Sequence, residues 1–534
     1  MVASTFGSRV TTRRVYALGA LAALLFGYDN GIIGAALLFI PQELPLTPLQ
    51  TGAVVSATVL GAMVGALGSG PAADRQGRQR VLLVAGVVFT VGALGTGLAP
   101  TVNGLVLFRF ILGLAIGIAS VTVPLYLAEM APAADRGTVT SLNQYLIIVG
   151  TALSAAIGYA LAFSGSWRWM LLVGVFPAVV LMVGMFTMPD TPRSLVRRGH
   201  PDQAREVLIG LRADPELAER ELTQITALEQ QQRDARTGAR LSAPWVRRLL
   251  LLGALLAIFQ QITGINAIVY YAPTILTGFG VSETTALLFG FLNGLVNIAT
   301  IALVVRSKVV DRRGRKPVLL AGLVGMSASL FAVGAAVLIL PGNSTALFVI
   351  AAAAFVVFTN TFSATWGPVL WVLLAEIFPL AIRGVAMAIA TLFNWLAAFV
   401  ISLTFPSFVA FAGIGSAFIV FAVIGVVLFP VVWWMVPETK ERSLESLEAA
   451  FRNGTGLSAT SKPTAAGAGG TRWPSTTALT GQACETCRGY AAPAAAARPA
   501  GTARVATTTG SPSSRGKPPR WPTSTEQAVS ITSG

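Results

Sequence analysis

Twelve apolar runs alternate with polar loops along the first 436 residues of the chain. About 20 consecutive apolar residues of helix cross a bilayer core of about 30 Å. Each run reaches that length, and the runs are continuous rather than alternating, which favours helices over a barrel. The runs cover residues 15–40, 49–71, 80–99, 104–130, 139–162, 168–188, 249–276, 284–306, 317–340, 345–374, 385–409 and 413–436. The pattern predicts an all-α integral membrane protein with twelve transmembrane helices.

The spacing of the runs predicts two bundles of six helices joined by a polar insertion. Within that insertion, Ala204, Val207, Leu208 and Leu211 recur at helical spacing, which predicts short amphipathic helices on the cytoplasmic surface. After residue 452 the chain is rich in Ala, Thr, Gly, Pro and Ser, a composition typical of disorder. The predicted parts are a basic cytoplasmic leader (1–14), an N-terminal six-helix bundle (15–188), a cytoplasmic helical linker (189–248), a C-terminal six-helix bundle (249–436), a cytoplasmic helix-end motif (437–452) and a disordered tail (453–534).

Composition and charge agree with this picture. The chain is 54% hydrophobic and 11% charged, whereas about a quarter of the residues of a soluble domain are charged. Lys and Arg cluster before the first run and in every second loop, so the positive-inside rule places both termini in the cytoplasm of a multi-pass cell-membrane protein. The net charge of +15 therefore requires no nucleic-acid partner.

The two cysteines, Cys484 and Cys487, both lie in the tail. Their spacing resembles half of a metal site, but no second pair or histidine accompanies them. We therefore expect no metal and no other cofactor.

A ten-position pattern, Ala-Glu-x-x-Pro-x-x-x-Arg-Gly, occurs once in each half of the hydrophobic region. Its glutamates are Glu129 and Glu376, 247 positions apart (376 − 129 = 247). Duplicated halves are usual in secondary transporters. The repeat therefore predicts two bundles related by pseudo-two-fold symmetry.

Two further repeats support the duplication. Residues 74–78 (Asp-Arg-Gln-Gly-Arg) match 311–315 (Asp-Arg-Arg-Gly-Arg), and 189–195 match 437–444. All three repeats lie at predicted cytoplasmic helix ends, where Arg and carboxylate groups can join when that side is closed and part when it opens. The alternative is that these charges only mark topology. The predicted cytoplasmic gate comprises Asp74, Arg78, Glu129, Arg136, Asp311, Arg315, Glu376 and Arg383.

Ionisable residues inside predicted membrane helices indicate function, because their burial in a bilayer is unfavourable. Asp29 lies about 21 Å along the first helix from residue 15, at about 1.5 Å per residue. Arg109 lies early in the fourth helix. A carboxylate near an arginine can alternate between an ion pair and a protonated form, as proton coupling requires. A static structural ion pair is the alternative.

Amide and aromatic side chains in the later helices suit a polyol. Amides both donate to and accept from hydroxyl groups, and Trp offers a flat face to the C–H groups of a sugar ring. The competing explanation is that amides join neighbouring membrane helices. The predicted substrate-binding residues are Gln144, Gln260, Gln261, Asn266, Asn297, Trp371 and Asn394. The predicted pocket walls or gates, for which ordinary packing competes, are Phe26, Tyr270, Tyr271, Phe362, Trp366 and Trp395.

These motifs together resemble the sugar porter family of the major facilitator superfamily over residues 10–450. The signatures are residues 70–78, 124–129, 189–195, the stretch from Gln260-Gln261 through Tyr271, residues 367–371, and residues 437–440. The resemblance implies a twelve-helix, two-bundle transporter that works by alternating access. It also implies that Asp29 and Arg109 match the proton-coupling pair of the family's symporters. Passive animal glucose carriers have Asn at the position of Asp29. The seven predicted substrate-binding residues match sugar-contacting positions.

The chain departs from the family pattern in two places. Asn297 and Asp311 are fourteen residues apart, about two more than the family spacing, so Arg306-Ser307-Lys308 is interpreted as an insertion. Ala72 replaces the usual Leu in the first loop motif.

The predicted function is proton-coupled symport of a monosaccharide or related polyol by a protein that works as a monomer in the lipid bilayer. The alternatives are a sugar uniporter of the same fold, a drug–proton antiporter, or a sugar sensor that does not transport. An enzyme is not expected, because the single histidine, His200, lies in the linker and no nucleophile–base pair stands out.

Overall fold

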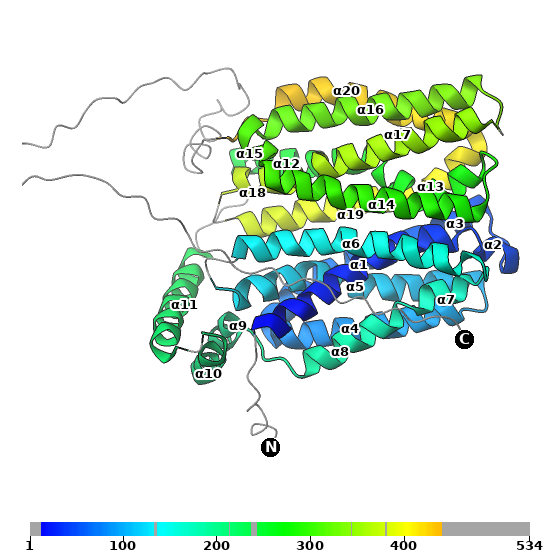
Figure 1. The fold of residues 1–534 in the computed structure, drawn as a ribbon. Helices are drawn as coiled ribbons and strands as arrows, with labels where there is room; N and C mark the ends of the chain where they lie inside the picture. The colour runs from blue at the N-terminus through cyan, green and yellow to red at the C-terminus, as the bar shows by residue number, and fades with distance from the viewer. Residues whose placement is uncertain are drawn as a thin grey trace, which may run out of the picture. The chain divides into compact units, whose positions relative to one another are not determined.

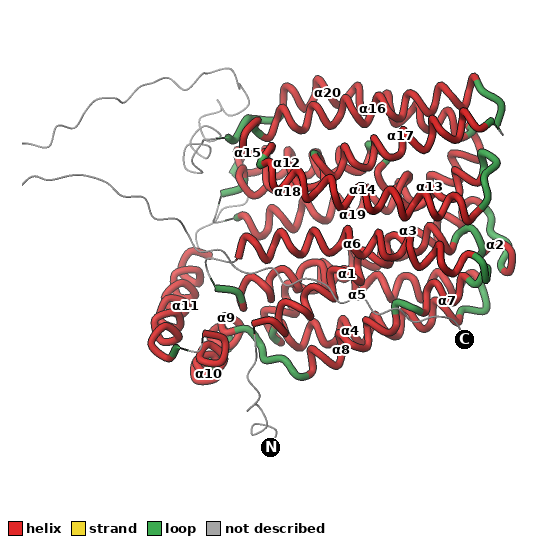
Figure 2. Tube along the Cα trace, in the orientation of Figure 1, coloured by secondary structure: helices red, strands yellow, loops and turns green. Residues whose placement is uncertain are grey.

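The computed structural model describes residues 12–132, 136–212, 214–236, 243–342, 344–379 and 382–440. Side chains are described over these ranges except at 12–13, 136–144 and 231–236. All these residues belong to one compact unit, Met1–Pro463. Their regular elements are all helices (Figures 1 and 2), and twelve spans are long and apolar enough to cross a membrane. The predicted tail, with Cys484 and Cys487, lies outside the described residues.

The first six spans form one bundle, in which small residues bring helices together. A Cβ atom on Gly113 would lie 2.2 Å from the carbonyl oxygen of Thr58, and one on Gly117 would lie 2.0 Å from that of Ala62, so only glycine fits these contacts of α5 with α3. The helices are α1 (Thr12–Ala36), α2 (Ile40–Glu43), α3 (Pro48–Gln76), α4 (Arg78–Leu98), α5 (Val102–Met130), α6 (Arg136–Ala162), α7 (Trp167–Leu172) and α8 (Val175–Phe186).

The polar insertion forms three helices at one end of the bundle, which we call the linker end (Figure 1). They are α9 (Pro192–Arg197), α10 (Pro201–Arg212) and α11 (Pro215–Arg236). Ala204 and Leu208 are fully buried, as expected of the apolar face of an amphipathic helix. We call the opposite end the far end.

The last six spans form the second bundle. Its helices are α12 (Pro244–Ile262), α13 (Ile265–Thr277), α14 (Glu283–Ser307), α15 (Val309–Arg313), α16 (Arg315–Ile339), α17 (Thr345–Ala364), α18 (Trp366–Ile377), α19 (Arg383–Ala412) and α20 (Ile414–Met435). Hydroxyl side chains cap four of the helices that begin at the far end. Thr47, Thr101, Ser282 and Ser344 each accept a hydrogen bond from a backbone N–H three residues later.

Three of the predicted spans are not continuous helices. Span 168–188 is divided into α7 and α8 at Val173 and Gly174, near its start. The other two are divided deeper within the span. Span 249–276 is divided into α12 and α13 at Thr263 and Gly264, where Gly264 has a φ of +91°. Span 345–374 is divided into α17 and α18 at Thr365. Polar residues and glycine gather at both of these deeper breaks, but each span stays apolar on average, with a mean hydropathy of 1.7 for Pro244–Thr277 and 2.0 for Thr345–Ile377, which is why averaged hydropathy does not detect the breaks. Both lie well inside their spans, where transporters commonly place binding sites.

The predicted insertion coincides with a backbone irregularity. α14 ends at Ser307, and Lys308 has a φ of +49°, the only positive φ of a non-glycine residue within the described ranges. The chain then resumes as α15. In the first bundle the matching helix, α3, runs unbroken through Asp74 to Gln76.

The two bundles contact each other mainly towards the far end. A Cβ atom on Gly52 of α3 would lie 2.1 Å from the carbonyl oxygen of Leu403 of α19, and one on Gly34 of α1 would lie 2.9 Å from that of Tyr270 of α13. The hydroxyl of Tyr270 also donates to Oδ1 of Asn30, at 3.3 Å. The far end is therefore closed in this conformation.

Candidate substrate and proton sites

Asp29 and Arg109 form a buried ion pair inside the first bundle. Their side chains are 5% and 2% exposed, and Nη1 of Arg109 lies 3.2 Å from Oδ1 of Asp29. Nη2 of Arg109 lies 3.5 Å from Oδ2, so the guanidinium faces both carboxylate oxygens. Nε of Arg109 donates to the carbonyl oxygen of Val54 on α3 at 2.9 Å. The structure thus brings the two predicted proton-coupling residues together and attaches them to a third helix.

Four of the predicted substrate-binding amides bond to one another at the break between α12 and α13. Asn394 donates to Oε1 of Gln260 at 2.9 Å and accepts from Nε2 of Gln261 at 3.1 Å. Asn266 donates to Oε1 of Gln261 at 2.9 Å. Gln260 also donates to the carbonyl oxygen of Trp366 at 2.8 Å. The structure brings these four amides together, and much of their hydrogen-bonding capacity is used within the group.

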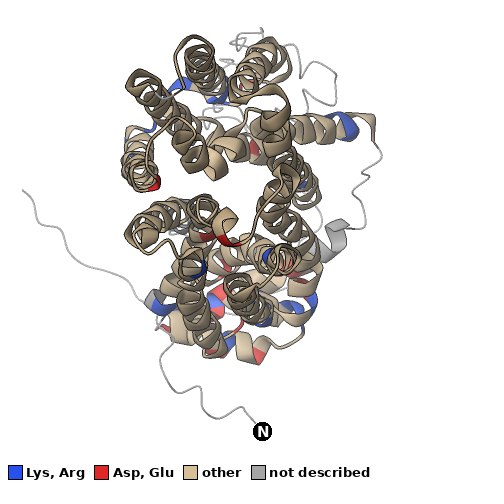
Figure 3. Cartoon of the chain, turned by 90° about the vertical axis from the view of Figure 1, so that its right-hand side faces the viewer, with Lys and Arg blue, Asp and Glu red and all other residues tan. Residues whose placement is uncertain are grey.

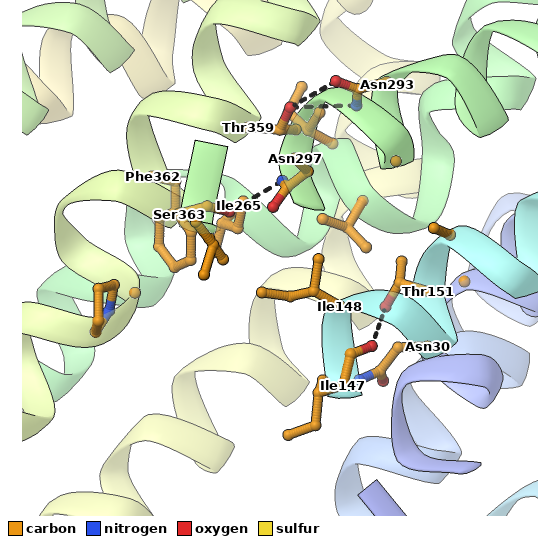
Figure 4. A pocket seen from close by; sticks show the side chains of 18 of the residues that line it. Asn30, Ile147, Ile148, Thr151, Ile265, Asn293, Asn297, Thr359, Phe362 and Ser363 are labelled. Atoms are coloured by element: carbon orange, nitrogen blue, oxygen red, sulfur yellow. Dashed lines mark hydrogen bonds between the residues drawn. The ribbon is translucent and has the colours of Figure 1, made fainter. Parts of the chain in front are cut away.

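A cavity of about 960 Å³ lies between α6 of the first bundle and α13, α14 and α17 of the second (Figure 4). Of the predicted substrate-binding residues, Asn266 and Asn297 line it. The cavity continues along α14 as far as Arg306 and Lys308, at the linker end. Since the far end is closed, the cavity opens towards the linker end.

The predicted wall residues divide into two groups. Tyr270 and Phe362 line the cavity. Trp366 is fully buried and donates from Nε1 to the carbonyl oxygen of Leu319, so it packs in the core. The hydroxyl of Tyr271 donates to the carbonyl oxygen of Ser402 at 2.8 Å.

Three further predicted residues, Phe26, Trp371 and Trp395, are not among the residues that line the cavity. Phe26 and Trp395, from opposite bundles, have ring centroids 6.2 Å apart. Trp371 is partly buried against the core of the second bundle. The side chain of Gln144 lies outside the described residues, although the next residue, Tyr145, lines the cavity.

Other cavity-lining polar residues were not predicted. They include Asn30, Asn293, Thr359, Ser363 and Thr151. Asn293 precedes Asn297 by one helical turn within an apolar run, so an amide in a membrane helix was a signal available in the sequence. Thr151 and Ser363 carried no such signal, because hydroxyl residues are common in membrane helices.

The repeated charged residues form one network in each bundle. In the first, Nε of Arg78 lies 3.1 Å from Oε2 of Glu129, and Nη2 lies 3.4 Å from Asp74. The hydroxyl of Thr191 donates to Glu129, and Asp190 accepts from the backbone N–H of Arg78 at 2.9 Å. The third repeat thus completes the network begun by the first two.

The second bundle repeats this arrangement residue for residue. Nη2 of Arg315 lies 2.7 Å from Oε1 of Glu376 and 3.3 Å from Asp311. The hydroxyl of Thr439 donates to Glu376, and Glu438 accepts from the backbone N–H of Arg315 at 3.0 Å. The charged side chains differ in exposure: Arg78 and Glu129 are 2% and 6% exposed, Arg315 and Glu376 13% and 27%.

Within the part of the chain that the structure describes, the contacts given above join helices of one bundle and do not run from one bundle to the other. Nε of Arg383 donates to the carbonyl oxygen of Phe378 at 3.1 Å, and its buried Nη2 has no partner within the described residues. The side chain of Arg136 lies outside the described residues. Figure 3 shows Lys, Arg, Asp and Glu on the ribbon, viewed from the far end.

The linker attaches to the first network through Glu229 of α11. Glu229 accepts from Arg193 and from Arg197, whose Nη1 also contacts Asp74. Burial tends to raise the pKa of the Glu229 carboxyl, but the hydrogen bonds from Arg197 and Arg193 outweigh it and lower that pKa to about 2. Glu229 is therefore ionised at neutral pH and holds α11 against α9.

The sequence and the fold are similar to those of known proteins. The family described as sugar (and other) transporter matches residues 15–451. The D-xylose transporter of Levilactobacillus brevis is 42% identical over 453 residues, which cover 84% of this chain and 97% of that protein. The galactose-proton symporter of Escherichia coli is 37% identical over 441 residues, 82% of this chain and 94% of that protein.

A solved structure, the inward-open conformation of the xylose transporter XylE from E. coli, has a TM-score of 0.71 and 30% identity. The match covers 82% of this chain and 99% of that one.

Proposed function

The chain belongs to the sugar porter family of the major facilitator superfamily, and from that membership we propose that it imports a monosaccharide or related polyol together with a proton. Membership confirms the predicted fold class, and it makes the chain a multi-pass membrane transporter rather than an enzyme. The assignment of a proton as the second cargo rests on one observation, the buried Asp29–Arg109 pair. Ion pairs of this kind inside a membrane bundle commonly mark proton relays.

The position of this pair supports coupling to the cargo. The next residue, Asn30, lines the cavity and accepts a hydrogen bond from Tyr270 of the second bundle. Arg109 holds the carbonyl oxygen of Val54, two residues from Gly52, which packs on Leu403 at the far end. Protonation of Asp29 removes its attraction for Arg109, and the change reaches α3 through the Val54 contact. The proton site and the closed far end are thus connected by direct contacts.

We place the linker end, with both termini, in the cytoplasm of a cell in whose plasma membrane the protein works as a monomer. The basic loops gather at that end, as the positive-inside rule requires. In the cycle we propose, the protein takes up a proton at Asp29 and a sugar at the middle of the membrane. The bundles then rock, and both cargoes leave towards the linker end.

The proposal is tested with purified protein in liposomes and a panel of labelled sugars, with and without an imposed pH gradient. We expect accumulation of at least one monosaccharide or polyol only when the outside is acidic. Equilibration without accumulation under the same gradient would identify a uniporter and overturn the proton assignment.

A further inference from the structure

A seam of polar side chains joins α14 to α17 beside the cavity. Asn293 donates to the hydroxyl oxygen of Thr359 at 3.2 Å, and Asn297 donates to that of Ser363 at 3.0 Å. Deeper in the seam, Asn360 donates to Oδ1 of Asn293 at 3.2 Å and accepts from Thr300 at 2.8 Å.

The seam has two faces. Asn293, Asn297, Thr359 and Ser363 line the cavity, whereas Thr300 and Asn360 are not among the lining residues. Figure 4 shows the first four on one wall of the cavity, opposite Asn30 and Thr151. Both faces therefore carry amide and hydroxyl side chains, but only those on the cavity face can reach a ligand in the cavity.

The bonds within the seam use part of the hydrogen-bonding capacity of the cavity face: the hydroxyl of Thr359 donates to the carbonyl oxygen of Phe355 at 2.8 Å, and Oδ1 of Asn293 accepts from Asn360. Other groups remain unused. Each amide has two N–H donors, and Asn293 and Asn297 use one each for the contacts to Thr359 and Ser363. Oδ1 of Asn297 is buried and has no partner within the described residues. An unpaired buried polar group is unfavourable. If the seam only joined the two helices, we would expect its polar groups to be fully paired with one another.

The group of Gln260, Gln261 and Asn394 contrasts with this wall. Its members are buried and bonded to one another, and none of the three lines the cavity. Asn266, which is bonded to Gln261, does line the cavity. A polyol that contacts Asn266 and Asn297 therefore has further hydroxyl partners available on α14 and α17.

We infer that Asn293, Thr359 and Ser363 form a second hydroxyl-binding subsite, which takes the part of a polyol that extends beyond the ring held at Asn266 and Asn297. Asn293 lies one turn, about 6 Å at about 1.5 Å per residue, from Asn297, which suits a substituent one or two atoms outside the ring. The subsite rests on the proposed function in requiring a polyol cargo. It does not depend on proton coupling.

The test compares two sugars that differ by one hydroxymethyl group, D-xylose and D-glucose, in calorimetric binding to the purified full-length protein. Thr359→Val removes the hydroxyl and keeps the shape, so it should weaken binding of D-glucose about tenfold and of D-xylose less than about threefold. Ser363→Ala should act in the same direction. Thr359→Ser keeps the hydroxyl and should bind both sugars as the parent does.

Thr300→Val is the matched control, because its hydroxyl is bonded to Asn360, away from the cavity. If this control changes the ratio of the two affinities as Thr359→Val does, or if Thr359→Val leaves that ratio unchanged, the seam is helix packing and the subsite is wrong. A parent protein that binds D-xylose but not D-glucose would also overturn it. Absence of binding by both sugars would overturn the subsite and the proposed function together, whereas binding without response to a pH gradient would contradict only the coupling.

Discussion

Nε of Arg109 donates to the carbonyl oxygen of Val54 at 2.9 Å, so the arginine that faces Asp29 also holds the backbone of a neighbouring helix. That helix, α3, carries Gly52 against Leu403 of the second bundle. A guanidinium can make both contacts because its donors point in several fixed directions. Asp29 is therefore connected to the contact between the bundles through Arg109 and α3 alone.

Replacing Asp29 by Asn should separate sugar movement from proton movement. Asn has nearly the same shape but cannot ionise, so Arg109 keeps a hydrogen-bond partner while the protonatable group is lost. We expect Asp29→Asn vesicles to exchange labelled for unlabelled sugar at a rate within about threefold of the parent, a change of less than about 1 kcal/mol. They should not accumulate sugar on a pH gradient. Accumulation by Asp29→Asn would show that the proton binds elsewhere.

The two repeated networks should differ in their sensitivity to the same substitution. Arg78→Met leaves Glu129 buried without its main cation, which should lower the free energy of unfolding by about 3–5 kcal/mol. Arg315→Met should lower it by only about 1 kcal/mol, because Glu376 is 27% exposed and water can solvate it. Chemical unfolding of each variant in detergent measures the difference.

The double variant Arg78→Met/Glu129→Leu is the control for the first network. Removal of both charges should recover much of the loss, because no unpaired buried carboxylate remains. Equal losses for Arg78→Met and Arg315→Met would contradict the ranking by burial.

Much of the fold was predictable because membrane burial imposes a strong compositional signal. The twelve spans and the linker helices follow from apolar run length and loop charge, and the duplication follows from the spacing of Glu129 and Glu376. The breaks at Gly264 and Thr365 were not predictable in this way, because the average hydropathy of a span does not distinguish one long helix from two short ones. The end of α1 at Ala36, rather than at residue 40, likewise has no hydropathy signal.

The site was predictable in its members more than in its arrangement. Asp29 and Arg109 are conspicuous charges in apolar helices, and their pairing follows from their depth. Which amides face the cavity depends on helix rotation and on the breaks, so Gln260, Gln261 and Asn394 could not be distinguished from Asn266 by sequence. The conformation also matters, because the gate residues form contacts within each bundle in a state closed at the far end.

Substitution of Lys308 by Gly should stabilise the protein. Lys308 has a φ of +49°, a left-handed conformation that disfavours a side chain by about 1–2 kcal/mol. Glycine removes this strain but gains flexibility in the unfolded chain, so we expect a net gain of about 1 kcal/mol or less. The thermal midpoint in detergent should rise for Lys308→Gly and fall for Ala302→Gly, which places glycine within helix α14. A lower midpoint for Lys308→Gly would mean that its side chain contributes more than the strain removes.

The attachment of the linker should weaken in acid. The pKa of Glu229 is lowered to about 2, so its ionised form stabilises the docked linker above the carboxyl's ordinary pKa of 4.5. That stability is lost as the pH falls from about 4.5 towards 2, where the carboxylate takes up a proton and releases Arg193 and Arg197. The protection of α11 amides against hydrogen exchange, relative to their intrinsic exchange rates at each pH, should fall over this range.

Two variants control for general acid effects on the linker. Glu229→Gln should exchange quickly in α11 at neutral pH and lose most of the dependence. Glu219→Gln should behave as the parent, because Glu219 and its partner Arg205 are both more than half exposed. Loss of protection in α11 with the same midpoint in Glu229→Gln would assign the effect to another group.

Replacing Gly52 by Leu should shift the protein away from the state closed at the far end. A Cβ atom at this position would lie 2.1 Å from the carbonyl oxygen of Leu403, so any side chain pushes α3 from α19, whereas the interior of each bundle is untouched. The state open at the linker end should therefore be depopulated. In a background lacking Cys484 and Cys487, a Val304→Cys substitution places a thiol on the cavity wall towards that end. Its labelling should slow at least about tenfold in Gly52→Leu, which corresponds to a population shift of about 1.4 kcal/mol.

Gly113→Ala is the matched control, because its Cβ would meet Thr58 of the same bundle at 2.2 Å. It should lower the thermal midpoint without slowing labelling. Unchanged labelling in a folded Gly52→Leu protein would mean that the contact between α3 and α19 does not govern opening of the cavity.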